Sequence, residues 1–173
     1  MSDPRIRPAT DDDWPRIWPF FHEIVLAGET YAFPEDLTEQ TGRGWWMESP
    51  PGLTVVLEDD GHLLGSAKMG PNRPGRGDHV GTASFMVDPT AEGRGVGRAL
   101  AAYVVDWHRT QGYAGIQFNA VVETNAAAVH LWRSVGFEVV GTVPGAFRSR
   151  THGPVGLHVM YLPLDRPGPA PVS

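Results

Sequence analysis

One stretch of the sequence, residues 79–112, places a strand, a glycine-rich turn and a helix in direct succession. The segment HVGTASFMVDP reads as a strand and stops at Pro89, because proline cannot continue a central ladder. Glycines then occupy alternate positions, and Gly112 ends the helix that follows. The apolar residues of that helix share one face: Val96, Leu100, Tyr103, Val104 and Trp107. This order predicts an α/β fold in which the turn joins a strand to a helix N-terminus.

The turn has the composition of a phosphate-binding site. Main-chain N–H groups and the positive end of the helix dipole converge there on one small volume. Gly93, Gly95 and Gly97 leave the main chain open to close approach, since a side chain would block it. Arg94 and Arg98 bracket the turn and can neutralise phosphate charge. The sequence therefore predicts a phosphate-bearing ligand at residues 93–98.

The spacing of the glycines argues against two common nucleotide-binding turns. A P-loop needs Gly-Lys-Ser/Thr, and the chain has none. A dinucleotide fingerprint needs G-x-G-x-x-G, but its last position falls on Arg98 or on Leu100 in the two possible registers. The turn also lies in the middle of the chain, after a predicted hairpin. A nucleotide-dependent oxidoreductase is therefore disfavoured.

The N-terminal half predicts a strand, a helix and a hairpin. IRPAT is strand-like, and Thr10 with Asp13 forms a capping pattern before a helix. The apolar stripe of that helix is Trp14, Ile17, Trp18, Phe21 and Ile24. Pro34 indicates the start of a short second helix. LTVVLED and GHLLGSAKMG form a hairpin about the favoured turn dipeptide Asp60–Gly61.

The C-terminal half predicts a second strand–helix unit and two more strands. GIQFNAVV is a short buried strand, and Thr124–Asn125 then caps a helix that ends at Gly136. FEVVGTV and VGLHVMYLPL are the last two strands. The proline-rich residues 166–173 predict a flexible tail after a single domain spanning residues 1–165.

Composition limits the class of function. The 41% hydrophobic and 20% charged residues are ordinary for a globular protein, and no stretch approaches the length of a membrane span. The absence of cysteine removes disulfides, thiolate nucleophiles and zinc–thiolate sites, and the seven histidines show no metal-binding spacing. The net charge of −6 disfavours a nucleic-acid partner and suits a cationic, amine-bearing substrate. The start of the chain lacks an apolar leader, so we expect a cytoplasmic location and no membrane partner.

Two segments resemble the GCN5-related N-acetyltransferase (GNAT) family. The cofactor signature of that family, Arg/Gln-x-x-Gly-x-Gly/Ala, is similar to residues Glu92–Gly97 within FMVDPTAEGRGVGRAL. NAAAVHLWRSVGFEVVGTV resembles the second conserved segment of the family, matching at Asn125, Ala128, Leu131, Gly136 and Phe137. The two signatures occur in the right order and spacing, and the resemblance covers residues 80–145 closely.

The resemblance implies a fold and a cofactor. The expected fold is an α/β (α+β) GNAT fold with a mixed, mostly antiparallel sheet of six to seven strands and about four helices. Strands 80–87 and 115–121 would form a splayed parallel pair, and acetyl-CoA would insert in the gap. The residues carried over to the cofactor are Met86, Val87, Gly93, Arg94, Gly95, Val96, Gly97, Arg98, Asn125, Ala128 and Trp132.

Two positions depart from the family pattern. Glu92 stands where the family usually has Arg or Gln, so a phosphate contact from that side chain is lost. Trp132 replaces the tyrosine that often protonates the departing thiolate, and an indole has no useful acidity. Tyr31 or Tyr161 is a candidate replacement acid, and a thiol pKa of about 8.5 makes the thiolate a fair leaving group. Trp132 is equally interpreted as a core aromatic.

The reaction needs a base, since a proton must leave the ammonium before the amine attacks the thioester. The candidate bases are Glu29, Glu123 and His79. Glu29 lies in the segment GETYAFPED beside the expected acceptor pocket, and Glu123 follows a strand next to the cofactor gap. The structural alternatives are a solvated helix-end carboxylate for Glu29, a capping charge for Glu123 and a rim residue for His79.

We therefore expect an N-acetyltransferase that uses acetyl-CoA and a primary amine of a small molecule or peptide in a ternary complex. The amine would enter from the side of Tyr31 and Trp46. A covalent enzyme intermediate is not expected, because cysteine is absent. The alternative is a non-catalytic module that binds or senses acyl-CoA. The acceptor stays open among an amino acid, a polyamine, an antibiotic amine and a peptide terminus, and exposed strand edges would permit a homodimer.

Overall fold

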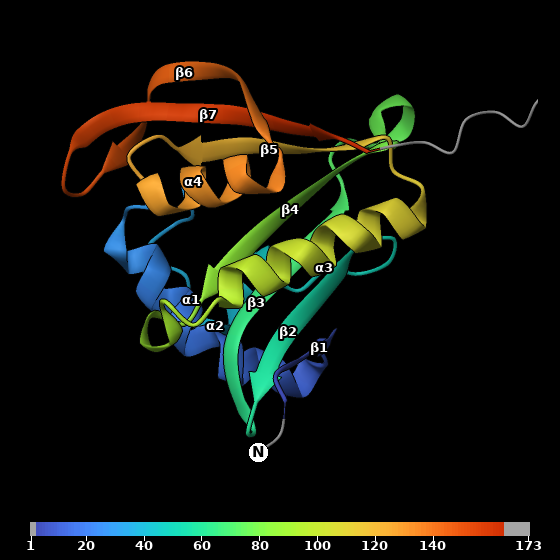
Figure 1. The fold of residues 1–173 in the computed structure, drawn as a ribbon. Helices are drawn as coiled ribbons and strands as arrows, with labels where there is room; N and C mark the ends of the chain where they lie inside the picture. Colours follow the sequence, from blue (N-terminus) through green and yellow to red (C-terminus); the bar gives the residue numbers. More distant parts are fainter. Residues whose placement is uncertain (1–2, 165–173) are drawn as a thin grey trace, which may run out of the picture.

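A seven-stranded mixed sheet forms the centre of the computed structural model, which describes residues 3–164 (Figure 1). The strand order is β1-β2-β3-β4-β5-β7-β6, and only the β4–β5 pair is parallel. The prediction of six to seven mostly antiparallel strands is confirmed. The strands are β1 (Arg5–Pro8), β2 (Leu53–Asp59), β3 (His62–Pro71), β4 (Val80–Val87), β5 (Gly115–Val122), β6 (Glu138–Ser149) and β7 (Gly153–Pro163).

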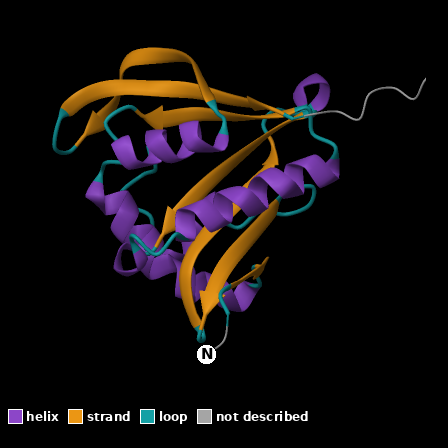
Figure 2. Cartoon of the chain, in the orientation of Figure 1, coloured by secondary structure: helices purple, strands orange, loops and turns teal. Residues whose placement is uncertain are grey.

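Four helices cover the two faces of this sheet, as Figure 2 shows in purple. On one face, residues of α1 pack with Trp46, Val56 and Met86. On the other face, α3 packs on β2 and β3, and α4 packs on β5 and β7. The helices are α1 (Trp14–Ala27), α2 (Glu39–Trp46), α3 (Val96–Gln111) and α4 (Ala126–Val135). Short 3₁₀ turns lie before α1 (Asp11–Asp13), between β3 and β4 (Gly75–Gly77) and between β4 and α3 (Pro89–Ala91).

The parallel strands β4 and β5 touch only at their first residues. Val80 pairs with Gly115 and Gly81 with Ile116, after which the two strands diverge. Both glycines lie under a side chain: a Cβ on Gly81 would come within 2.3 Å of the His108 ring, and one on Gly115 within 2.2 Å of the Tyr161 hydroxyl. The predicted splayed pair is therefore present, and its closed end is packed from both faces.

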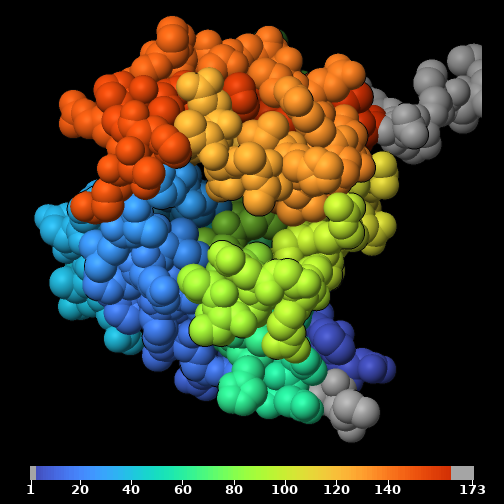
Figure 3. Space-filling view, turned by 60° about the vertical axis from the view of Figure 1, so that its left-hand side comes forward, coloured from blue at the N-terminus to red at the C-terminus, as the bar shows by residue number. Residues whose placement is uncertain are grey.

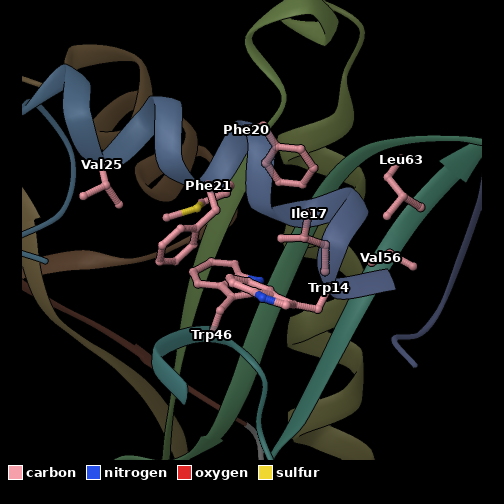
Figure 4. Packing of buried hydrophobic residues seen from close by; sticks show 9 residues of the cluster. Trp14, Ile17, Phe20, Phe21, Val25, Trp46, Val56 and Leu63 are labelled. Atoms are coloured by element: carbon pink, nitrogen blue, oxygen red, sulfur yellow. The ribbon is translucent and has the colours of Figure 1, made fainter. Parts of the chain in front are cut away.

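The cluster under α1 is rich in aromatic side chains (Figure 4). Trp14, Ile17, Phe21 and Trp46 are almost fully buried. The buried indole groups keep hydrogen bonds, since Trp46 Nε1 donates to Ser66 Oγ (2.9 Å) and Trp14 Nε1 donates to a main-chain carbonyl of α2 (2.7 Å). Burial of each large apolar side chain contributes about 2–3 kcal/mol, so this cluster fixes α1 and α2 on the sheet.

A network of ion pairs fixes the N-terminal strand and the start of α1. Arg7 donates to both carboxylate oxygens of buried Asp13 (2.7 and 2.9 Å) and to Glu58 (3.0 Å). Arg16 also pairs with both carboxylates. The hydrogen bond from Arg7 holds the pKa of Asp13 well below its usual range and lowers the pKa of Glu58 to about 2. Asp13 also closes the capping box with Thr10 that the sequence predicts.

The second helix begins later than Pro34 indicates. Residues 29–38 contain no helix, and α2 starts after Thr38, whose Oγ1 accepts from the Thr41 N–H (3.2 Å). The capping hydroxyl satisfies a free helix N–H and so sets the boundary. The predicted tail, residues 166–173, lies outside the described residues, and the limits of the domain stay a prediction.

Candidate active site

The glycine-rich turn between β4 and α3 presents bare main chain at a helix start. Gly93 and Gly95 adopt φ of +77° and +76°, a conformation that favours glycine. Gly95 is the N-cap of α3 and makes no side-chain capping bond. No atom lies within 4 Å of a Cβ built on either residue. The first N–H groups of α3 therefore face an open space that suits an anion.

The charged residues of the turn are exposed. Arg94 pairs with Asp59 at the end of β2 (2.9 Å), so that guanidinium is held by the β2–β3 hairpin. Arg98 lies in the first turn of α3, and Glu92 lies at the other end of the glycine turn. Two cations and two anions thus lie around the helix start, and Arg98 is the cation for which no ion pair is seen among the described residues.

The end of β4 borders the gap between the two sheet halves. The Asp88 N–H donates to the Leu64 carbonyl, on the β3 side (2.9 Å). Because main-chain groups alternate in direction along a strand, those of Phe85 and Val87 face the side from which β5 has diverged. Met86 is buried against the α1 cluster and does not face the gap. Gly97 completes this corner, since a Cβ there would lie 3.4 Å from Leu131 and 3.8 Å from Val87.

The α4 residues lie on the opposite side of the gap. Asn125 caps α4 through its side-chain oxygen, which accepts from the Ala128 N–H (3.2 Å). Trp132 is 7% exposed, and its ring lies 4.5 Å from Phe85 and 4.8 Å from Phe118 between centroids. Trp132 therefore bridges β4 and β5 where their main chains no longer meet. This position combines core packing with contact at the gap.

Tyr31 reaches the gap from the α1 side. Its hydroxyl donates to the Phe85 carbonyl (2.5 Å) and accepts from the Phe85 N–H (2.8 Å). The phenol thus takes both main-chain groups that a neighbouring strand would otherwise bind. Burial raises the pKa of Tyr31 well above its usual range, against a smaller opposite effect of its hydrogen bonds to Phe85 and Ser84. The Tyr31 proton is therefore retained at neutral pH.

The three candidate bases lie in different surroundings. Glu29 accepts hydrogen bonds from Ser149 and Thr151 in the β6–β7 turn, and these bonds lower its pKa. Glu123 follows β5, and one of its oxygens accepts from the Gly156 N–H of β7 (2.6 Å). His79 is exposed next to the closed end of the β4–β5 pair. The structure does not bring these three residues together.

Two hollows meet at this region. Figure 3 shows the surface hollowed between the orange residues of α4 and the C-terminal strands and the yellow-green residues at the start of α3. A second cleft of about 880 Å³ lies beside β3 and β4 and is lined by Glu48, Lys68, Thr82, Ser84, Asn72 and Asn119, among others. Along β4, the side chains of Thr82, Ser84 and Met86 lie on the face of the sheet that α1 covers, whereas the Phe85 side chain lies on the opposite face. Ser84 precedes Phe85, the main chain of which binds Tyr31, so β4 carries neighbouring residues of the cleft and of the gap.

Comparison with known proteins decides the family. The model of the acetyltransferase (GNAT) family matches residues 18–137. The chain belongs to the GNAT family. A GCN5-related N-acetyltransferase from Kribbella flavida is 58% identical, with a TM-score of 0.90 over 93% of this chain and 98% of that one. The yncA structure from Salmonella typhimurium, solved with its cofactor acetyl-CoA, is 25% identical over 99% of both chains, with a TM-score of 0.85.

A relative with a named acceptor covers a similar length. The L-methionine sulfoximine/L-methionine sulfone acetyltransferase of Pseudomonas paraeruginosa is 30% identical over 145 residues, which is 80% of this chain and 83% of that protein. This GNAT protein is accordingly an acetyl-CoA-dependent N-acetyltransferase that acts on an amine acceptor. No helix among residues 3–164 is long and apolar enough to cross a membrane.

Sequence reasoning missed several polar residues of this acetyltransferase. Lys68 donates to Glu48 (3.1 Å) and to the Trp45 carbonyl (2.8 Å) inside the polar cleft. Ser84 lines this cleft and precedes Phe85, the main-chain partner of Tyr31. Lys68 of β3 is the register partner of Ser84 of β4. In each predicted strand a polar residue stands between apolar ones, and this alternation was the signal that could have placed both residues on a polar part of the sheet.

Proposed function

We propose that this acetyltransferase transfers the acetyl group of acetyl-CoA to the primary amine of a small, amino-acid-like molecule. The observation that carries the proposal is the polar cleft beside β4, the lining of which includes Ser84, the residue before the Phe85 that Tyr31 binds. Its volume of about 880 Å³ suits a small molecule. Lys68, Arg73, Glu48 and Asp78 give the lining both signs of charge, which favours a zwitterion over a polycation. The relative that acetylates L-methionine sulfone supports the same class.

The cofactor would bind across the hollow between α3 and α4. We propose that the main chain from Gly93 to Arg98 holds the diphosphate, because the N–H groups at the helix start and the exposed Arg98 guanidinium lie there. The open main-chain groups of Val87 would bind the pantetheine arm from the β4 side. Asn125, Ala128 and Trp132 would contact it from α4. Met86 would not contact the arm, since its side chain is buried under α1 and its main-chain groups face β3 by the same alternation.

The catalytic roles follow from the environment of each side chain. With its raised pKa, Tyr31 is a weaker acid than a thiol, whose pKa is about 8.5. We therefore propose that Tyr31 does not transfer a proton, and that it holds the β4 main chain at Phe85, the carbonyl of which takes its only hydroxyl hydrogen. Glu123 is the proposed base, because only one of its oxygens accepts a hydrogen bond from the described residues. Attack is direct, because a chain without cysteine has no thiol to carry the acetyl group.

The experiment is a thiol-release assay with acetyl-CoA and a panel of amines. We expect α-amino acids, methionine sulfone included, to be acetylated faster than diamines or peptide N-termini, with intersecting initial-rate lines. Lys68→Met should raise the acceptor KM about tenfold and leave the acetyl-CoA KM unchanged. Arg76→Met is the matched control, since Arg76 lies in the 3₁₀ turn Gly75–Gly77 between β3 and β4 and is not among the residues that line the cleft. Preference for a peptide or a diamine, or parallel initial-rate lines, would overturn the proposal.

A homodimer and a cytoplasmic location stay predictions. The sheet ends in two edge strands, β1 and β6, and β6 exposes Val140 and Val143, at 70% and 54%. We propose β6 as the edge that a second copy would use. Light scattering of the wild type and of Val140→Lys measures this, and a concentration-independent monomer mass for the wild type would refute it.

A further inference from the structure

The segment 28–31 touches both halves of the split sheet. At one end the Gly28 carbonyl accepts from the Arg150 N–H (3.1 Å), and the Glu29 carboxylate binds the β6–β7 turn. At the other end Tyr31 binds the main chain of β4 at Phe85. We call residues 28–31 the strap. Because Glu29 and Tyr31 are two residues apart, their Cα atoms are at most about 7 Å apart, so the strap ties the halves closely.

The Glu29 carboxylate is engaged at both oxygens. Ser149 Oγ donates to Oε2 (2.5 Å), while the Thr151 N–H (2.8 Å) and the Thr151 hydroxyl (2.7 Å) donate to Oε1. Ser149 is itself 5% exposed, and its oxygen accepts from the His152 N–H (3.0 Å). Three donors on one carboxylate stabilise its charged form, which makes it a poor proton acceptor and a strong anchor.

The anchoring matters because the main chains of β4 and β5 separate after their second residue pair. Beyond Gly81 and Ile116 no ladder holds the two halves together. The strap supplies a connection at the open end, and Figure 3 shows the blue N-terminal residues meeting the red C-terminal strands at the left of the hollow. Further links at that end are the packing of Trp132 on Phe85 and the exposed ion pair of Glu35 with Arg150.

We propose that Glu29 is a positioning residue that sets the width of the gap between β4 and β5, through the strap. This rests on the proposed function, in which that gap holds the arm of acetyl-CoA. Removing the carboxylate breaks its three hydrogen bonds to the β6–β7 turn and leaves the Arg150 N–H to Gly28 carbonyl bond, so the gap widens and the contacts with the cofactor arm loosen. Glu29 neither receives nor delivers a proton in this role.

The test compares Glu29→Gln with Glu29→Ala. Gln can accept from Thr151 through its oxygen and donate to Ser149 through its amide, so it should retain the strap and at least about a third of kcat. Ala should raise the acetyl-CoA KM about tenfold or more, and Ser149→Ala added to Glu29→Ala should have little further effect. The pH profile of kcat should be the same for wild type and Gln. Equal losses of kcat in Gln and Ala, with a lost limb of the profile, would identify a base and overturn the proposal.

Hydrogen exchange without acetyl-CoA gives a readout that does not need activity. Glu29→Ala should speed exchange in residues 83–87 and in residues 149–152, whereas Glu29→Gln should not. Glu35→Ala is the matched control, because Glu35, four residues after the strap, forms an exposed ion pair with Arg150 of the β6–β7 turn (2.7 Å). If hydrogen exchange in folded Glu29→Ala equals that of the wild type, the proposal that Glu29 sets the width of the gap through the strap is refuted. A wild type that exchanges as expected but binds no CoA in calorimetry would instead refute the proposed function.

Discussion

Gly95→Glu should abolish tight binding of CoA while leaving the protein folded. Gly95 has φ +76° at the start of α3, and nothing lies within 4 Å of a Cβ placed there. The new Cβ therefore has open space around it, and the side chain enters the region where we place the diphosphate. It adds a negative charge at the same point, so both shape and charge oppose the ligand.

Two magnitudes follow from this geometry. A non-glycine residue in the left-handed region costs about 1–2 kcal/mol, which lowers Tm by roughly 3–6 °C for a chain of this size. A hydrogen bond between an N–H and a charged phosphate contributes about 1.5–3 kcal/mol, so losing one weakens Kd by roughly 10- to 150-fold. Gly95→Ala should fall in this range, and Gly95→Glu should exceed it.

Gly61 offers a matched control for backbone strain. It has φ +75°, is exposed in the β2–β3 turn, and has nothing within 4 Å of its Cβ position. Calorimetric titration with CoA and thermal melts should show a similar Tm loss in Gly61→Glu and Gly95→Glu, with weaker CoA binding only in the second. Wild-type affinity in Gly95→Glu would refute the assignment of the turn, as would an equal loss of affinity at Gly61.

The other predictions concern the base, the ion-pair network and the gap. Glu123→Gln should lower kcat about 100-fold, whereas the exposed Glu138→Gln should not; equal kcat in both would exclude Glu123 as base. Arg7→Met should cost about 3 kcal/mol in urea unfolding, because buried Asp13 loses its bidentate partner. Since the pKa of Glu58 is lowered to about 2 in the fold, its contribution is complete above its unfolded pKa near 4.5 and is lost as pH falls toward 2. A Tm that stays flat between pH 5 and 2.5 would contradict this. Trp132→Phe should reduce the free energy of unfolding by about 1–2 kcal/mol and raise the acetyl-CoA KM. If neither quantity changes, the Trp132 ring contributes neither to core packing nor to cofactor binding.

Local pattern accounts for most of the fold prediction. The stripe of Val96, Leu100 and Val104 predicts α3, and the same three residues are buried against the sheet. Gly112 and Gly136 end α3 and α4 with positive φ, as expected for glycine after a helix. Pro34 misled the prediction of the second helix, because a proline also fits a turn and the cap at Thr38 is a weaker sequence signal.

The sequence by itself determined the order of the elements, the glycine-rich turn between β4 and α3, and the family. These depend on residues close together in the chain, where periodicity, proline and glycine act directly on the backbone. The tertiary structure decided how distant residues meet at the gap. Glu29 binds Ser149 at a separation of 120 residues, and Tyr31 binds Phe85 at a separation of 54. Hydrogen bonds over such separations depend on how the sheet halves diverge, and side-chain spacing along the chain carries no signal of that divergence.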